Sequence, residues 1–331
     1  MLDHSLIEGI LDSLSSRTVG LIGDLFLDRY LDIDAALNEP SIETGLTAYQ
    51  VVQVRPIPGA LGTILNNLLA LGVGRVLPVT VIGDDGEGYE LRQQLQRNSR
   101  IDLSNILIDS RVRTPTYTKP MLHSADSAAT ELHRLDIKNR TPLPVDLELQ
   151  LLERFTHLFG QVDAWLVLDQ VSEQDCGVIT TNVRQHLGQL ALQQPNQFVL
   201  ADSRARIADF QHVCIKPNHH EAARFSASSY ADSFNRTVFV TQGDRGIVVQ
   251  QPHQSEVLCN AFPVTGPIDT VGAGDSTSAG IACAWMYNPN PCLAAAFGNL
   301  IASITIQQLG TTGCATPQQV RARWQQLQEQ L

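Results

Sequence analysis

The sequence lacks closely spaced cysteines. Its six cysteines are scattered along 331 residues, and none belongs to a C-x-x-C pair or to a cysteine–histidine zinc pattern. This spacing excludes a disulfide-stapled scaffold and a structural zinc site of the usual kind. It favours free thiols in a reducing compartment.

Long hydrophobic runs and an excess of basic residues are also absent. No stretch approaches the roughly 18 apolar residues of a membrane span, and residues 1–18 contain no basic region followed by an apolar run. We therefore expect a cytoplasmic protein without a membrane partner. The formal net charge of -11 argues against nucleic acid as a partner, so local groups must hold any anionic ligand.

What the sequence does contain is an alternation of short apolar runs with amphipathic segments. It is 43% hydrophobic and 17% charged, which suffices for a substantial core. This alternation predicts an α/β fold with a mostly parallel sheet between helices. The strand-like runs are 18–23, 76–83, 164–169, 197–202, 212–217, 237–242 and 246–251.

Several of these runs end in Asp or Asn, where open α/β sheets hold their ligands. For Asp24, after the first run, we expect a buried structural carboxylate bonded to loop amides. Residues 29–58 and 111–135 interrupt the alternation with threonine, tyrosine and valine among polar residues. They predict either short strands of a second, smaller sheet that caps the site, or loops that decorate the surface.

The stretch PIDTVGAGDSTSAG, residues 267–280, carries the most chemistry. Gly272-Ala273-Gly274 lies where a helix of small residues should begin, so unpaired amides and the positive end of the helix dipole form an anion hole. A carboxylate beside such a hole would repel a bound anion. Asp275 therefore indicates a general base that removes a proton from an attacking hydroxyl. The alternative is that Asp275 only caps the helix.

Other nucleotide-binding motifs fit poorly. No lysine follows Gly274 as a P-loop requires, and no strand is followed by G-x-G-x-x-G. These absences argue against a P-loop nucleoside triphosphatase and against a nicotinamide-dependent dehydrogenase.

The segment DTVGAGDSTSAG resembles the C-terminal signature of the ribokinase, or PfkB, family of carbohydrate kinases. The resemblance extends from about residue 18 to about residue 316, with similar blocks in the same order. The first and fourth blocks are most similar to the kinase domain of the heptose-7-phosphate kinases. The blocks are LIGDLFLDRY, PGALGTILNNLLALG, VTVIGDDGEG, TPTYTKPML, IKPNHHEA and VTQGDRG.

This resemblance implies one ribokinase-like domain, residues 1–331, whose small β-sheet lid is formed by 29–58 and 111–135. In the family such a lid often pairs two subunits, so a homodimer through the lid is expected. The implied activity is ATP-dependent phosphorylation of a hydroxyl on a sugar or a sugar phosphate. Magnesium is an implied cofactor, and potassium is a further one, near residues 309–314.

The resemblance also assigns roles to residues of this sequence. Asp275 matches the catalytic base, and Gly272, Ala273 and Gly274 match the anion hole. The other implied site residues are Asp28, Gly59, Thr63 and Lys119 for the acceptor, Asn218, Thr241, Gly243, Gly246 and Thr270 for ATP, and Glu221 and Asp269 for metal ions.

Three departures from the family pattern accompany the resemblance. The usual G-G-x-x-N of the substrate loop is Gly59-Ala60-Leu61-Gly62-Thr63 here, and Asp202 is followed by Ser203-Arg204 instead of Pro-Lys. Only about 20 residues separate Glu221 from Thr241, fewer than the family usually has. These departures leave open a second hypothesis, a catalytically weak or inactive protein that binds a sugar or nucleotide as a sensor.

Overall fold

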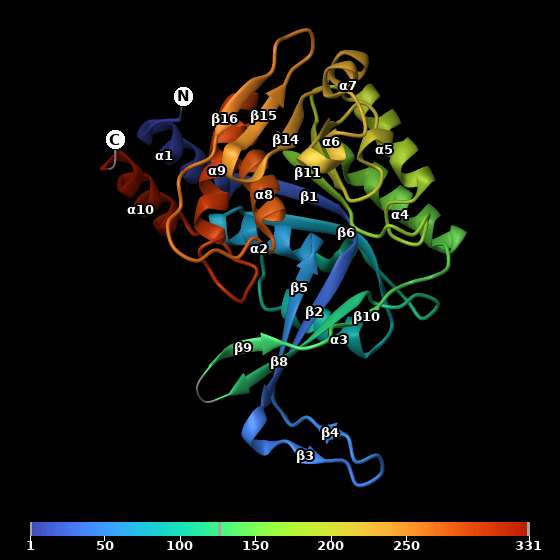
Figure 1. Ribbon diagram of the computed structural model, residues 1–331. Helices are drawn as coiled ribbons and strands as arrows, with labels where there is room; N and C mark the ends of the chain where they lie inside the picture. The colour runs from blue at the N-terminus through green and yellow to red at the C-terminus, as the bar shows by residue number, and fades with distance from the viewer. Residues whose placement is uncertain (1, 125–126, 330–331) are drawn as a thin grey trace.

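The computed structural model describes residues 2–124 and 127–329 (Figure 1). In that part of the chain a nine-stranded sheet forms the centre of the molecule. From β7 to β14 all neighbouring strands run parallel, and β15 and β16 extend the sheet antiparallel. In spatial order the strands are β16 (Val257–Asn260), β15 (Gly246–Gln250), β14 (Val238–Thr241), β13 (Cys214–Ile215), β12 (Phe198–Ser203), β11 (Ala164–Asp169), β1 (Thr18–Gly23), β6 (Arg75–Gly83) and β7 (Ile106–Asp109).

Helices cover both faces of this sheet because its inner strands bury both sets of alternating side chains. Leu166 of β11 belongs to one hydrophobic core and Val167 to the other. The first core is covered by α1 (His4–Ser13), α2 (Leu61–Leu71), α8 (Ala273–Tyr287), α9 (Pro291–Thr305) and α10 (Pro317–Gln328). The second is covered by α4 (Val145–Leu158), α5 (Thr181–Gln193) and α7 (Ala227–Phe234).

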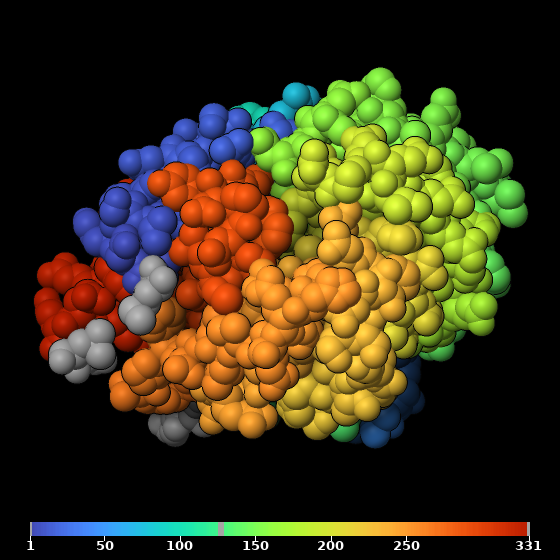
Figure 2. Space-filling view, turned by 90° about the horizontal axis from the view of Figure 1, so that it is seen from above, coloured from blue at the N-terminus to red at the C-terminus, as the bar shows by residue number. Residues whose placement is uncertain are grey.

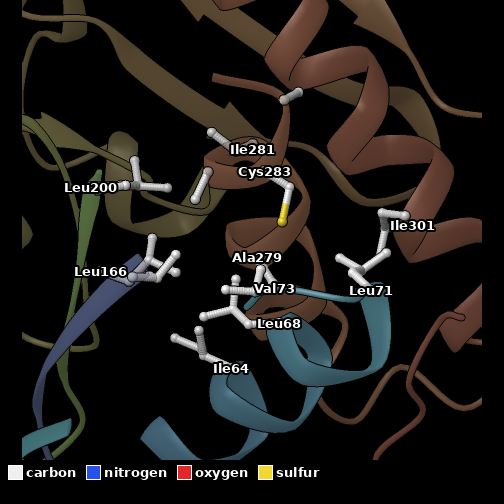
Figure 3. Packing of buried hydrophobic residues seen from close by; sticks show 14 of the residues in the cluster. Ile64, Leu68, Leu71, Val73, Leu166, Leu200, Ala279, Ile281, Cys283 and Ile301 are labelled. Carbon is white, nitrogen blue, oxygen red and sulfur yellow. The ribbon is translucent and has the colours of Figure 1, made fainter. Parts of the chain in front are cut away.

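The first core joins α2 and α8. The predicted substrate loop leads into α2, and the glycine turn Gly272-Ala273-Gly274 lies at the start of α8. Leu68 of α2 and Ala279 of α8 pack there with Leu166 and Leu200 of the sheet (Figure 3). All four side chains are at most 1% exposed. The N-termini of α2 and α8 are thus fixed relative to one another by packing.

A second, smaller sheet projects from the body of the molecule (Figure 1). Its order is β10-β8-β2-β5, with β9 paired to β8, and β2 and β8 run parallel. Only Asp24 separates its first strand from β1, so the chain passes directly from one sheet into the other. The strands are β2 (Leu25–Asp34), β5 (Val51–Ala60), β8 (Thr116–Ser124), β9 (Ser127–Glu131) and β10 (Leu135–Ile137).

This arrangement confirms the predicted fold class, a mostly parallel sheet between helices with a small second sheet. The small sheet uses 25–60 and 116–137, slightly beyond the predicted 29–58 and 111–135 at three of four boundaries. Residues 125–126 of the second predicted segment lie outside the described residues. Between β2 and β5 the chain forms an arm, residues 35–50, that lies farthest from the body in Figure 1. The arm contains η2 (Ala35–Leu37), β3 (Glu39–Pro40) and β4 (Thr47–Ala48).

The two ends of the described chain lie side by side, as Figures 1 and 2 show. Glu8 of α1 and Arg321 of α10 form an ion pair of 2.7 Å. None of the described helices is both long and apolar enough to span a bilayer. The remaining short helices are η1 (Leu14–Ser16), α3 (Gly86–Leu95), η3 (Leu103–Asn105), η4 (Phe159–Gln161), η5 (Ile207–Asp209), α6 (His219–Ala222) and η6 (Gly243–Arg245).

Candidate active site

The carboxylate of Asp24 has a structural role, as expected. It is 2% exposed and accepts hydrogen bonds from the backbone N–H groups of Gln170, Val171 and Val178 at 2.7, 3.0 and 2.7 Å. Burial and the charge of Asp169 raise the pKa of Asp24 to about 6, against the effect of these hydrogen bonds. Asp24 thereby fixes the loop after β11.

The glycine turn lies at the start of α8. Gly272 is the N-cap residue with a φ of 78°, a conformation that a side chain would strain. The N–H of Ala273 donates to the carbonyl of Thr270 at 3.1 Å, whereas the N–H groups of Gly274 and Asp275 have no acceptor among the described residues. The positive end of the helix thus presents unpartnered donors, which suit an anion.

Asp275 lies in the first turn of α8 and is partly exposed. No side-chain hydrogen bond caps this helix, so Asp275 is not its cap. Burial of the carboxyl group and the charge of Asp202 raise the pKa of Asp275 to about 7, against the opposing effects of Lys216 and Arg204. A carboxylate with this pKa can accept a proton near neutral pH.

Asp28 and Lys119 meet on the small sheet, on the neighbouring strands β2 and β8. The Lys119 ammonium lies 3.5 Å from the Asp28 carboxylate and donates to the Tyr30 hydroxyl at 3.2 Å. Burial raises the pKa of Asp28, and Lys119 opposes this shift. The charge of Asp28 also contributes to the raised pKa of Asp275.

Gly59 leaves room for Asp28. A methyl group added to Gly59 would lie 2.8 Å from the carboxyl carbon of Asp28, closer than real contacts allow. Thr63 lies in the first turn of α2, is 2% exposed, and faces the glycine turn. A methyl group added to Gly272 would lie 3.3 Å from Cγ2 of Thr63. The substrate loop and the glycine turn are therefore in contact.

The substrate loop keeps the backbone of a glycine at a position that holds alanine. Ala60 is the N-cap residue of α2 and has φ 52° and ψ −114°. Residues with a side chain rarely adopt this conformation, and it costs on the order of 1–3 kcal/mol. Ala60 thus has a backbone conformation that a glycine adopts without strain.

Asn218 and Glu221 form a capping box at the start of α6. The Asn218 side chain accepts from the amides of His220 and Glu221, both at 2.9 Å, and Glu221 accepts from the Asn218 amide at 2.8 Å. Burial raises the pKa of Glu221, and the hydrogen bond from Asn218 opposes the shift. Thr241 forms a parallel bridge with Asn218, so both residues lie at the carboxyl end of the central sheet.

Gly243 and Gly246 flank η6, the turn that follows β14. Both have positive φ, 61° and 103°. A side chain at Gly246 is excluded, because a methyl group there would lie 2.2 Å from the carbonyl oxygen of Cys259. The turn is therefore shaped by its glycines, and its backbone stays accessible beside Thr241.

Asp269 joins the signature segment to the loop that ends near residue 314. Its carboxylate accepts from the amides of Val271 at 3.0 Å and Gly310 at 3.1 Å, and its own amide donates to the Ile306 carbonyl at 2.8 Å. Thr270 lies next to it and binds the Ala273 amide. Both residues thus hold the glycine turn in place.

Metal-ligating side chains are sparse across the described residues, where no group of three or more His, Cys, Asp or Glu could hold an ion. His219 and His220 are exposed in the first turn of α6. A hollow of about 1280 Å³ lies between α1, α9, α10 and β16, is mostly apolar, and contains none of the predicted site residues.

Lys216 is the site residue that the sequence did not single out. It follows β13, is 3% exposed, and forms an ion pair of 2.7 Å with Asp202. The sequence could have indicated Lys216, because it is a charged residue at the end of an apolar, strand-like run. The sequence cannot show that Asp202 lies beside it, because that depends on the order of the strands.

The fold that these elements form is found in solved sugar kinases. The structure superposes on the ribokinase of Arabidopsis thaliana complexed with ribose and ATP with a TM-score of 0.62, at 14% identity, over 93% of this chain and 98% of that one. A phosphofructokinase-2 mutant from Escherichia coli gives a TM-score of 0.65, at 17% identity, over 94% and 99%. These likenesses show the ribokinase-like fold.

The sequence places the chain within a family. Residues 32–319 match the pfkB family carbohydrate kinase model, and the chain belongs to that family. It is 28% identical to the bifunctional protein HldE of Caulobacter sp. over 90% of this chain, and 27% identical to that of Trichlorobacter lovleyi over 97%. The chain spans 61% and 65% of the length of these two relatives.

Proposed function

We propose that this chain transfers the terminal phosphoryl group of ATP to a hydroxyl of a sugar or a sugar phosphate. The observation that carries the proposal is the Asp275 carboxylate in the first turn of α8, beside unpartnered amides. Its pKa of about 7 lets it accept the hydroxyl proton. The amides and the helix dipole offset charge on the group in transfer. Membership of a carbohydrate kinase family supports this assignment.

The acceptor side favours a substrate that already carries phosphate. Asp28 can accept hydrogen bonds from sugar hydroxyls, and Lys119 lies beside it. The Arg134 guanidinium, paired with Asp136 at 2.7 Å, lies 4.2 Å from the centre of the Tyr117 ring, and Tyr117 is the neighbour of Asp28 on β8. A neutral sugar needs no such cations, whereas a phosphate group does. The similarity to heptose-7-phosphate kinases points the same way.

ATP is expected to lie at the end of the sheet where Asn218 and Thr241 are paired, beside Gly243 and Gly246 of the following turn. Glu221 offers a carboxylate oxygen there, since only Oε2 bonds to the Asn218 amide. Oxygen ligands without a protein cage fit a magnesium ion held chiefly by phosphates and water. Such an ion would neutralise phosphate charge during transfer.

Potassium would lie where the Asp269 loop meets residues 306–314. Its supporting geometry is the pair of hydrogen bonds that join Asp269 to Ile306 and Gly310. Both Asp269 oxygens already accept amides, so Asp269 would shape the loop for the ion. Activity with potassium in place of sodium tests this assignment.

We further propose that two copies pair through the small sheet and the arm that extends from it. The arm carries exposed apolar side chains at Leu37, Ile42 and Leu46, and Tyr49 is 48% exposed. Such side chains favour a protein interface. Sedimentation equilibrium should give a dimer for the natural chain and a monomer for Ile42→Asp/Leu46→Asp. An unchanged monomer in both would contradict the proposal.

A substrate panel tests the proposed activity. Sugars and their phosphate esters are assayed with ATP, Mg²⁺ and K⁺, and products are identified by mass spectrometry. We expect turnover with at least one sugar phosphate and little with its unphosphorylated parent. Ligand-induced thermal stabilisation without turnover across the panel would instead favour the sensor hypothesis.

A further inference from the structure

Lys216 and Asp202 form a buried ion pair at the carboxyl end of the sheet. Strands β12 and β13 run parallel with Ala201 opposite Ile215, so the next residue on each strand lies beside its counterpart. The Lys216 ammonium lies 2.7 Å from the Asp202 carboxylate and is 96% covered along its side chain. Burial lowers the pKa of Lys216, but Asp202 and Asp275 outweigh this effect and leave the pKa raised.

The Lys216 ammonium lies next to the glycine turn. A methyl group added to Gly274 would lie 3.6 Å from Nζ, with nothing else within 4 Å. Lys216 also acts electrostatically on both Asp275 and Glu221. Its ammonium thus lies beside the first turn of α8, which carries the proposed base.

This ammonium has donors to spare. It carries three N–H groups, and its only ion-pair partner among the described residues is Asp202. Buried ion pairs contribute little to stability compared with apolar side chains of similar volume. The chain contains only three lysines, and two of them, Lys119 and Lys216, are buried at this site. A purely structural pair does not explain this placement.

We propose that Lys216 is a phosphate-binding residue, held in position by Asp202, that donates to the terminal phosphoryl group of the nucleotide above the glycine turn. The unpartnered amides and the helix end supply only about half a charge. Lys216 adds an ammonium donor, already held in place by Asp202, that needs no reorganisation when the nucleotide binds. This inference rests on the proposed phosphoryl transfer and adds a residue to it.

The proposal predicts that Lys216 distinguishes a triphosphate from a diphosphate. Calorimetry measures the affinities of β,γ-methylene-ATP and of ADP, each with Mg²⁺ and without a sugar, in the natural chain and in Lys216→Met. We expect Lys216→Met to weaken the triphosphate analogue at least tenfold and ADP less than threefold, and to lower kcat at least 100-fold. Lys216→Arg should keep part of the triphosphate preference, and Lys138→Met, at a lysine outside the site, should keep all of it.

Three outcomes would overturn the proposal. One is a Lys216→Met variant with unchanged nucleotide affinities and kcat. Another is an equal loss of both affinities together with a lower melting temperature, which indicates a structural role. If Lys216→Met does not fold, Asp202→Asn/Lys216→Met removes both charges at once. A triphosphate preference that persists in this double variant would be the third contradiction. A natural chain that binds neither nucleotide would instead contradict the proposed function itself.

Discussion

The N-termini of two helices, α8 and α2, lie at the candidate site, and they differ in the N-cap residue and in the burial of the first turn. Both α8 and α2 begin at a residue with positive φ and no side-chain cap. At α8 this residue is Gly272, and its first turn is open enough to present amides and Asp275. At α2 it is Ala60, and Leu61, Gly62 and Thr63 behind it are all buried.

This difference suggests that phosphoryl transfer and recognition of the acceptor depend on different helices. The start of α8 presents unpartnered amides and a carboxylate, the groups that the proposed phosphoryl transfer uses, while the start of α2 is buried and carries Ala60 and Leu61. We infer that transfer chemistry is retained at α8, and that the acceptor is recognised more by Asp28 and the cations of the small sheet than by the α2 loop. Substitutions at the two helices should therefore affect different kinetic parameters.

The largest effect on the acceptor side is expected from Gly59→Ala. The added methyl group would lie 2.8 Å from the carboxyl carbon of Asp28 and displace that side chain. We expect kcat/KM for the sugar acceptor to fall at least 100-fold, with nucleotide affinity within threefold. Gly86→Ala is the matched control, because nothing lies within 4 Å of a methyl group there. Equal losses in both variants would remove the distinction between the two helices.

The pH dependence of kcat/KM should report chiefly on Asp275 at the start of α8. Because the pKa of Asp275 is raised from 3.8 to about 7, the base is charged above that pH and protonated below it. We expect kcat/KM to fall tenfold per pH unit below about pH 7 and to level off above it. Asp202→Asn removes a repulsive charge and should move this limb to lower pH. The exposed Asp209→Asn should leave it unchanged. If the pH at which kcat/KM begins to fall is the same in Asp202→Asn as in the natural chain, a group other than Asp275 titrates.

The smallest effect concerns stability and should have opposite signs at the two helices. Ala60→Gly relieves a strained φ and should stabilise the fold by about 1 kcal/mol, after the entropy gained by the unfolded chain is subtracted. Ala273→Gly at the start of α8 relieves nothing and should destabilise by about 0.5 kcal/mol. Thermal unfolding measures both, with shifts of about 2 °C or less. Destabilisation by Ala60→Gly would show that this loop is not strained.

Sequence reasoning was most accurate where one strand or one helix start decided the outcome. The runs 18–23 and 164–169 coincide with β1 and β11, and the glycine turn begins α8 as predicted. The small sheet was placed too late in the chain, at 29 instead of 25, because Asp24 alone forms the passage from β1 to β2. Polar Asp24 and Asp28 resemble a loop in sequence, although Asp28 lies within a strand.

Other features depend on neighbours far away in the sequence. The burial of Lys216 follows from β13 lying next to β12, and no local pattern encodes that adjacency. The positive φ of Ala60 could not be predicted from the sequence either, because alanine normally has a negative φ.

The most direct test of the central claim is the kinetics of Asp275→Asn. Asparagine keeps the shape of the side chain but cannot accept the hydroxyl proton. The account predicts that kcat falls by about 10³-fold while the dissociation constant of ATP with Mg²⁺ changes less than threefold. A variant that retains most of its kcat, or that loses nucleotide affinity in the same proportion as kcat, would contradict the assignment of Asp275 as the base.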